Sequence, residues 1–317
     1  MDPLSDLLRV VRLDGAYFYA VEAYAPWSAE TLPAEELARH VAPSTDHVIS
    51  YHILTEGSCH AGLVGGEQVE LVPGDVIVFP QGDPHVMSSG PGVRLGGDRL
   101  DGPASRYPFT AVLGEKGPRQ TSLVCGFLSC DRAPFNPLIE SLPRQMHLKG
   151  VSNPWLHAFA LELAEEARLG RSGVDSVVTR LAEVMFIQLL RHHVDAMAPR
   201  QTGWLAGLRD PIVGRALSLM HARIDHSWTV AELAHQTHSS RTTLSKRFAE
   251  LVGQPPMQYL ARWRMQVAAN LLTQTTTKVS AIGLRVGYDS EAAFSRAFKK
   301  ATGLAPSAWR ESRSGPG

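Results

Sequence analysis

Three residues in the first half of the chain carry side chains that could bind a metal ion: His52, His85 and Cys125. His52 stands in an apolar run with Ile53 and Leu54, and His85 follows a turn rich in glycine and proline. Imidazole nitrogen and thiolate sulfur together suit zinc or another borderline divalent metal. A thiolate is also the form of cysteine that oxidants attack. These residues predict a zinc site, and with it a possible sensor of oxidants.

A purely structural interpretation of the same residues stays open. Strand histidines can be buried and hydrogen-bonded, and a buried cysteine behaves as a small apolar residue. The other two cysteines, Cys59 and Cys130, could join the site as ligands or redox partners. Three irregularly spaced cysteines do not form the disulfide framework of a small secreted domain.

A second kind of chemistry is indicated near the end of the chain, where two short helical patterns each begin after a serine. Ser240 and Ser290 are the expected N-caps. Polar residues on the outward faces of these helices are expected to contact DNA; the alternative is an ordinary solvated face. The expected contacts are Arg241, Thr242, Ser245, Lys246, Glu291, Ala292, Ser295, Arg296, Lys299 and Lys300. Arg296 is the best candidate for a base contact because its planar fork fits guanine, whereas Lys299 and Lys300 suit phosphates.

The elements that would position these residues form an internal repeat. Leu244 corresponds to Phe294 and Phe248 to Phe298, with an offset of 49 residues before the turn and 50 after it. Each copy has a short helix, a tight turn and a second helix, the pattern of a helix-turn-helix. Two copies in one chain predict a protein that binds two stretches of one DNA face.

A connecting helix of about 16 residues, or about 24 Å, is expected to separate the two copies. A rigid spacer of this order could place the recognition helices in successive major grooves, about 34 Å apart. Arg262 and Arg264 lie on this helix. The sequence leaves open which of them contacts phosphate and which is structural.

The charge distribution agrees with a nucleic-acid-binding region at one end. The chain has 31 Lys and Arg and 31 Asp and Glu, so its formal net charge is zero. Residues 205–317 hold 15 of the basic and 7 of the acidic residues, a net charge of +8, which leaves −8 on residues 1–204. A basic terminal domain beside an acidic one fits DNA at one end and another ligand at the other.

The rest of the chain divides by its periodicity. Residues 10–130 show short alternating runs between Gly and Pro turns, which predicts a small β-sandwich or barrel. Residues 174–194 are apolar on more than one side of a helix and must be covered by the barrel or by a second subunit. The chain has no apolar run of about 18 residues and does not begin like a signal peptide. A cytoplasmic protein without membrane spans is therefore expected.

The second repeat resembles the signature of AraC/XylS-type transcription regulators. The matching run is Ala281-Ile282-Gly283-x-x-Val286-Gly287-Tyr288-Asp289-Ser290-x-x-x-Phe294-Ser295-Arg296-x-Phe298-Lys299-Lys300-x-x-Gly303-x-x-Pro306-x-x-Trp309-Arg310. The resemblance covers about residues 210–311. It implies seven helices, two recognition helices, RNA polymerase as a partner and control of transcription, often activation. Gly283 departs from the alanine usual in the family, and glycine in a helix costs about 1 kcal/mol relative to alanine.

The N-terminal part resembles cupins through the run Gly74-Asp75-Val76-Ile77-Val78-Phe79-Pro80-Gln81-Gly82-Asp83-Pro84-His85. A metal-binding cupin would have Asn where this chain has Ser89, and would carry His-x-His and Glu upstream. Only His47, His52 and Glu56 are found there. The incomplete ligand set disfavours dioxygenase chemistry, although a metal-dependent cupin enzyme fused to a DNA-binding domain remains the alternative.

Together these patterns predict a multidomain chain. We expect an all-β cupin-like sensor over residues 1–145, a helical linker and dimerisation segment over 146–204, and an all-α DNA-binding domain over 205–317. The expected function is a dimeric, sequence-specific transcription regulator, controlled by a small-molecule, metal or redox effector in the cupin-like domain.

Overall fold

The computed structural model of the chain describes residues 2–42, 45–95, 110–117, 120–150, 154–169, 171–198 and 201–313. Its residues form two compact units. The helical unit comprises Met1–Arg12, Asp131–Ser141 and His193–Gly317. The sheet unit comprises Leu13–Cys130 and Leu142–His192. This grouping by contacts does not follow chain order, so the three consecutive ranges expected from the sequence stay a prediction.

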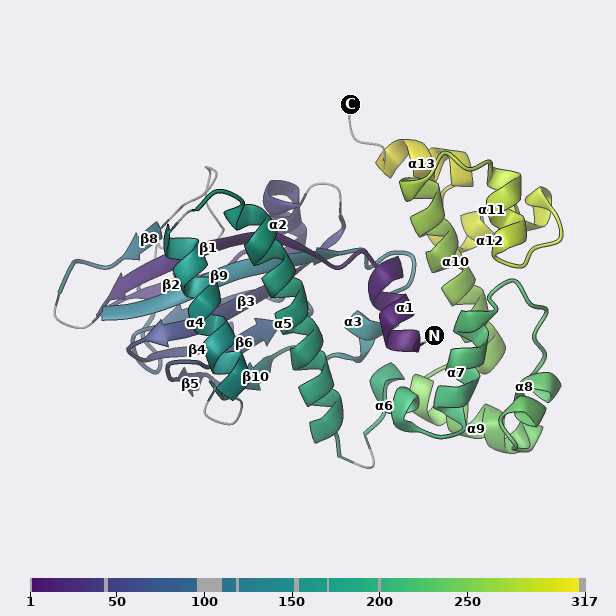
Figure 1. Cartoon of the computed structure of the whole chain (residues 1–317), viewed down its shortest axis with the longest axis horizontal. Coiled ribbons are helices and arrows are strands. Elements are labelled where there is room, and N and C mark those ends of the chain that lie inside the picture. The colour runs from purple at the N-terminus through teal and green to yellow at the C-terminus, as the bar shows by residue number, and fades with distance from the viewer. Residues whose placement is uncertain are drawn as a thin grey trace. The chain divides into compact units, whose positions relative to one another are not determined.

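The sheet unit contains a six-stranded sheet in the order β10-β6-β3-β9-β1-β8 and a four-stranded sheet in the order β2-β7-β4-β5 (Figure 1). A shared apolar core joins the two sheets, as expected for a cupin-like fold. The strands are β1 (Asp14–Tyr24), β2 (Ser28–Glu30), β3 (His47–Glu56), β4 (Cys59–Leu63), β5 (Val69–Leu71), β6 (Val76–Phe79), β7 (His85–Ser88), β8 (Thr110–Leu113), β9 (Gln120–Cys130) and β10 (Met146–Leu148).

The central strand β3 is buried on both of its faces. Its first eight residues, from His47 to Leu54, are all buried. One face belongs to the core between the sheets, and helix α4 (Pro154–Leu169) contacts β1, β3 and β9. Helix α2 (Ala34–Val41) also packs on β3. A sheet covered on both faces has no solvent side, so the polar residues His47, Ser50 and His52 of this strand are buried together with its apolar ones.

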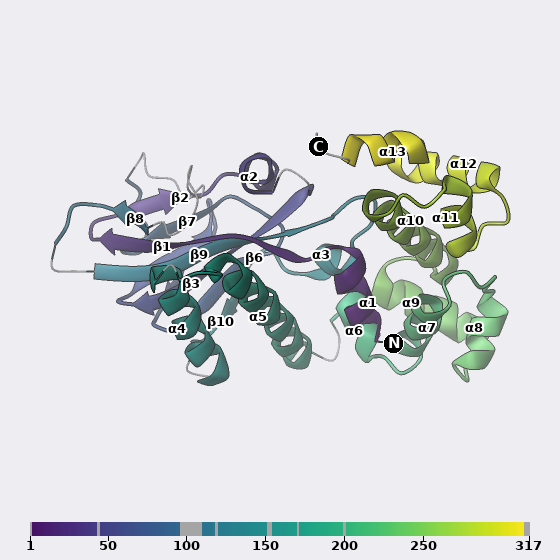
Figure 2. The ribbon, with the colours of Figure 1, turned by 45° about the horizontal axis from the view of Figure 1, so that its top comes forward.

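Helix α5 (Val174–Ala196) lies beside α4 (Figures 1 and 2). One side of α5 is buried, including Met185, Phe186, Leu189 and Leu190. Other residues of the same chain therefore cover one side of this apolar helix, which the sequence predicts must be covered by the barrel or by a second subunit. Across the described residues, no helix combines the length and the apolarity that crossing a membrane requires.

In the helical unit, seven helices from α7 to α13 occupy the described residues after α6, the number that the family resemblance implies. Helices α7 to α9 gather at one end of the long helix α10, and α11 to α13 gather at its other end (Figure 2). The helices of this unit are α1 (Pro3–Val10), α3 (Pro137–Ser141), α6 (Trp204–Arg209), α7 (Val213–Ala222), α8 (Val230–Gln236), α9 (Arg241–Val252), α10 (Pro256–Gln274), α11 (Val279–Arg285), α12 (Glu291–Thr302) and α13 (Pro306–Arg313).

Candidate DNA interface and sensor site

The first helix-turn-helix unit consists of α8 and α9. Thr229 caps α8 by accepting a hydrogen bond from the Glu232 N–H at 3.1 Å. The Glu232 carboxylate pairs with His226 Nε2 at 2.7 Å. His238 takes a left-handed backbone in the turn, with φ of 53°. Ser240 then caps α9 through the Thr243 N–H, as predicted.

The second unit repeats this arrangement in α11 and α12. Gly287 has φ of 80° at the position equivalent to His238, and Ser290 accepts from the Ala293 N–H at 3.2 Å. Phe294 and Phe298 are fully buried, as are their first-unit counterparts. The apolar stripe therefore fixes which face of each recognition helix points outward.

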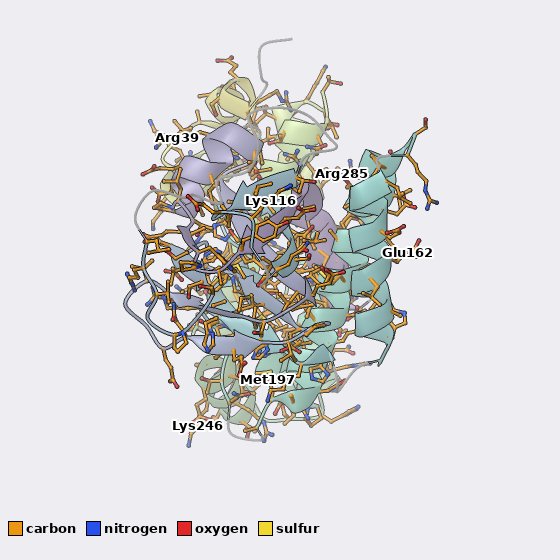
Figure 3. All side chains as sticks on the ribbon, turned by 90° about the vertical axis from the view of Figure 1, so that its left-hand side faces the viewer. Arg39, Lys116, Glu162, Met197, Lys246 and Arg285 are labelled. Carbon is orange, nitrogen blue, oxygen red and sulfur yellow. The ribbon has the colours of Figure 1, made fainter. Side chains whose placement is uncertain are left out.

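The predicted DNA contacts lie on these outward faces. Ser245 and Ser295 are half-buried, and all the others are exposed: Arg241, Thr242, Lys246, Glu291, Ala292, Arg296, Lys299 and Lys300. The Lys246 side chain extends away from the ribbon of α9 (Figure 3). In the second unit, Arg285 is the last residue of α11, the helix before α12. Lys246 Nζ lies 3.9 Å from the Glu250 carboxylate, one turn along the helix. This long, exposed ion pair leaves the Lys246 ammonium accessible to DNA. Their placement fits DNA contact, and the contacts themselves stay a prediction.

Gly283 has a packing role beyond the softness expected from its helix propensity. A Cβ at this position would lie 3.0 Å from Phe294 Cβ and 3.1 Å from its Cγ. Both atoms are close to the backbone of α12 and cannot easily move away. The glycine therefore allows α11 and α12 to approach closely, and the alanine usual in the family would require a small shift here.

The two arginines of the connecting helix are both engaged within the protein. Arg264 donates from Nε to the Ile224 carbonyl at 2.9 Å, and from its two Nη atoms to His226 O at 2.8 Å and Gly287 O at 3.3 Å. Ile224 and His226 precede α8, whereas Gly287 lies in the second turn. One guanidinium thus ties together the two helix-turn-helix units. Arg262 pairs with Glu140 at 2.8 Å, so both arginines have partners within the helical unit, and phosphate contact by either stays a prediction.

The connecting helix α10 is longer than expected, at 19 residues. At 1.5 Å per residue this is about 28 Å, against the 24 Å expected. It extends to Gln274, and neither glycine nor proline occurs in it after Pro256. A longer rigid helix is still of the order needed to separate two recognition helices.

In the sheet unit, the structure brings His52 and His85 into direct contact, Nε2 to Nε2, at 2.7 Å. The Nδ1 atom of His85 lies 3.0 Å from the Asp83 carbonyl, which can only accept a hydrogen bond, and 2.9 Å from the Thr31 hydroxyl, which donates to the His85 carbonyl and can accept from Nδ1. His85 therefore donates from Nδ1 and accepts at Nε2, so His52 donates from its own Nε2. The remaining lone pair, on His52 Nδ1, has no hydrogen-bond partner among the described residues.

The histidine pair is buried and uncharged. Desolvation by burial lowers the pKa of His85 to about 4, although the backbone bond to Asp83 opposes the shift. Desolvation by burial also lowers the pKa of His52 well below its usual value, and the neighbouring His85 adds to this. The ring of Phe79 stacks on His85 with centroids 3.7 Å apart. Arg144 holds the Asp83 carboxylate with two hydrogen bonds, which fixes the loop before His85.

Cys125 is the register partner of His52 on the neighbouring strand β9, so the two side chains share one face of the sheet. However, no group of three or more His, Cys, Asp or Glu side chains suited to a metal ion occurs within the described ranges. The residues present provide two imidazoles and a nearby thiol, which do not complete a zinc site as they stand. Zinc binding by His52, His85 and Cys125 therefore stays a prediction.

The cysteines differ from the reactive thiolates considered in the sequence analysis. Cys59, Cys125 and Cys130 are buried and unbonded to one another. Desolvation by burial raises the pKa of Cys59 to about 12 and that of Cys125 well above its usual value. These two thiols are protonated at neutral pH and screened from solvent, so direct oxidation there is disfavoured.

Sequence reasoning missed the side chains that set the geometry of both sites. The sequence leaves open whether Arg264 contacts phosphate or is structural, because its three carbonyl partners are distant in sequence. Asp83 and Phe79 hold His85 but were seen only as parts of the cupin-like run. The sequence signal for these residues is the loop between Pro80 and Pro84 that precedes His85. That signal does not specify the tautomer of the His85 ring.

A sheet-rich domain joined to two helix-turn-helix units defines a DNA-binding transcription regulator with an N-terminal ligand-sensing domain. A cupin family model matches residues 2–195, and a helix-turn-helix domain model matches residues 233–312. The chain is 30% identical over 315 residues to a putative AraC-like transcription regulator of Streptomyces antibioticus, covering 98% of this chain and 99% of that one. The chain belongs to the AraC family of transcription regulators.

Two further similarities complete the comparison. The RCS-specific HTH-type transcriptional activator RclR of Escherichia coli is 28% identical over 268 residues, with 83% of this chain and 84% of that protein covered. The crystal structure of the DNA-binding domain of AdpA in complex with a target DNA is 28% identical, covers 32% of this chain and 92% of that one, and has a TM-score of 0.31.

Proposed function

We propose that this protein acts in the cytoplasm as a dimeric transcription activator that places two recognition helices on one operator and receives its signal at the His52–His85 pair. The observation that carries the proposal is the pair of matched units, each with a serine-capped recognition helix, a buried aromatic or aliphatic stripe and an outward polar face. RNA polymerase is the expected partner, and the activator name of the Escherichia coli relative supports this direction of control.

Arg296 and Lys299 test the assignment of roles along α12. Arg296→Ala should weaken specific binding by about 1–3 kcal/mol and relax preference at one base pair, because it removes a fork that can bind a base edge. Lys299→Ala should weaken binding to all sequences alike and reduce the slope of log affinity against log salt by about one, as for a phosphate contact. Binding assays on specific and scrambled duplexes at several salt concentrations distinguish the two. Unchanged affinity and selectivity in Arg296→Ala would remove it from the base-reading set.

The proposed dimer surface is the exposed side of α5. Val177, Leu181 and Val184 stand at positions i, i+4 and i+7, and Val177 and Val184 are 44% and 42% exposed. The buried side of the same helix carries Leu189 and Leu190, which are at most 1% exposed. The apolar pattern of the sequence alone would suggest that a charge at Leu189 or Leu190 breaks a dimer. Because both side chains are buried within the chain, such a charge is instead expected to unfold it.

Val184→Glu should therefore give a folded monomer at concentrations where the wild-type chain is a dimer. The reason is that a stripe shared by two copies would bury an unpaired carboxylate in each. Sedimentation of the full chain provides the measurement. Ser176→Glu, an exposed polar position away from the stripe, is the matched control and should remain dimeric. A wild-type chain that sediments as a monomer at high concentration would contradict the dimer.

Zinc binding at the sensor is tested by elemental analysis of the purified full chain. If His52, His85 and Cys125 hold zinc, we expect about one equivalent per chain, with occupancy falling as pH drops, because the Cys125 thiol, whose pKa burial raises, must lose its proton on binding. Cys125→Ala should lower the occupancy and alter the response of a reporter gene, while DNA binding is retained. Metal-free protein, together with a normal reporter response in Cys125→Ala, would exclude zinc as the signal.

The non-enzymatic assignment rests on the same geometry. Each histidine of the pair uses Nε2 to bind the other, and the cupin-like ligand set is incomplete in the described residues. The relatives named above are transcription regulators. A turnover assay is therefore expected to show no reaction, whereas duplex binding should be retained.

A further inference from the structure

Three polar residues form a stripe along one side of helix α10. Other segments of the helical unit cover part of this stripe. Arg262, Gln266 and Asn270 are spaced four residues apart and so lie along one side of the helix. Gln266 is 1% exposed, an unusual position for a polar side chain. A buried amide requires hydrogen-bond partners. Those partners come from two segments that are remote in sequence, both part of the helical unit.

The first segment is Asp131–Ser141, called the strap here. Gln266 Oε1 accepts a hydrogen bond from the Phe135 N–H at 2.9 Å. Phe135 is 1% exposed, and its ring receives the Arg262 guanidinium at 4.0 Å from the centroid. Arg262 also pairs with Glu140, further along the strap. The strap is thus held on α10 by one buried amide, one buried aromatic ring and one ion pair.

The second segment is the N-terminal helix α1, which contacts α7 and α10. Asn270 Nδ2 donates to the Val10 carbonyl at 3.0 Å. The two segments are also bonded to each other, since the Asp131 N–H donates to the Val11 carbonyl at 2.8 Å and Arg12 pairs with the Asp131 carboxylate at 3.7 Å. They therefore dock on α10 as one assembly.

Both segments continue directly into the centre of the six-stranded sheet. Residue 12 is followed by β1, which begins at Asp14, and the strap follows β9, which ends at Cys130. The two strands pair with each other at that end, Asp14 with Ser129. Strand β9 also pairs with β3, where Cys125 is opposite His52. Between His52 and the strap there is therefore only one strand, β9, which pairs with β3 and runs into the strap.

We propose that the polar stripe of α10 is the docking surface through which the state of the sensor reaches the recognition helices, with the strap and α1 as its partners. The proposal rests on the sensing role given above. Helix α10 joins the two DNA-reading units, so its position sets their separation. A docked strap then favours one placement of the units, and a displaced strap releases it.

Such coupling is reciprocal. If the docked strap raises the affinity for DNA, as the proposal holds, then DNA must stabilise docking by the same factor, typically about fivefold or more. Hydrogen exchange of the full chain, with and without a duplex that the chain selects from a random library, measures this without knowledge of the effector. Exchange at residues 131–141 should slow by at least about fivefold on DNA binding.

Gln266→Met removes the acceptor while keeping the side-chain length. In this variant DNA should still protect α9 and α12, but the slowing at residues 131–141 should be lost. Gln258→Met is the matched control, because Gln258 is an exposed glutamine on the same helix, and it should behave as wild type. No slowing in the wild-type strap, or the same slowing in Gln266→Met, would overturn the docking surface.

A charge swap keeps the inference testable if Gln266→Met does not fold. Arg262→Glu should lose the slowing in the strap, and adding Glu140→Arg should restore it. Failure of the second change to restore it would show that Arg262 acts elsewhere, for example on phosphate, and would contradict the proposal. If DNA protects neither α9 nor α12 in the wild-type chain, the proposed function itself fails, and the inference with it.

Discussion

Arg264→Leu should destabilise the helical unit by about 2–4 kcal/mol, since it removes hydrogen bonds from a charged donor to three carbonyls in a half-buried position. Its effect on DNA should be at least about tenfold in affinity, because Ile224, His226 and Gly287 belong to the two different reading units that the guanidinium joins. Denaturant unfolding and binding to a selected duplex provide the two measurements.

Arg262→Gln is the matched control for the stability measurement alone, because Arg262 belongs to the proposed docking surface and its loss should itself alter DNA affinity. It changes an arginine two residues away on the same helix, whose partner Glu140 is exposed, and exposed ion pairs contribute at most about 1 kcal/mol. Arg264→Lys should resemble the leucine variant more than wild type, because an ammonium cannot span three carbonyls. Equal losses of stability in Arg262→Gln and Arg264→Leu would show that no special brace exists.

Acid should destabilise the protein steeply below pH 6.5, before its carboxylates titrate. His52, His85 and His221 are buried, and desolvation lowers the pKa of His85 to about 4 and that of His221 to about 3, with His52 also well below its usual value. Neutral histidine is favoured in the fold, so this stability is fully present above the unfolded value of about 6.5 and is lost as the pH falls toward the folded values.

Each of these histidines can contribute a slope of up to about 1.4 kcal/mol per pH unit. Urea unfolding at pH 7.0, 6.5, 6.0 and 5.5 should reveal the uptake of two to three protons on unfolding at the lower end. His221 accepts from the Tyr259 hydroxyl, which in turn accepts from Trp204 Nε1, so His221→Asn should lose about one proton of uptake. Stability that is constant from pH 7.0 to 5.5 would contradict the neutral, buried assignment of all three.

The recognition helices could be predicted closely because their signals are local. The serine caps, the spacing of Phe294 and Phe298, and Gly287 each specify a turn or a face within a few residues. The repeat doubled every such signal. Outward side chains such as Arg296 follow directly once the buried stripe is known.

The parts that could not be predicted depend on partners distant in sequence. Nothing near Gln266 indicates that Phe135 will bind it, and nothing near residues 3–10 indicates that this helix packs with the C-terminal helices. The contact between His52 and His85 required the register of β3 against β6 and the placement of the loop at Asp83. Polar side chains satisfied by remote backbone groups leave no periodic pattern, so sequence reasoning identifies the residues without their pairing.

Selection of duplexes from a random library by the purified full-length chain tests the central claim most directly. A regulator with two reading units should enrich one motif with two short base-specific elements, about one helical turn apart. Arg296→Ala should relax one element and leave the other intact. Enrichment of no motif, or of a single element unaffected by Arg296→Ala, would contradict the claim that both helix-turn-helix units read the operator.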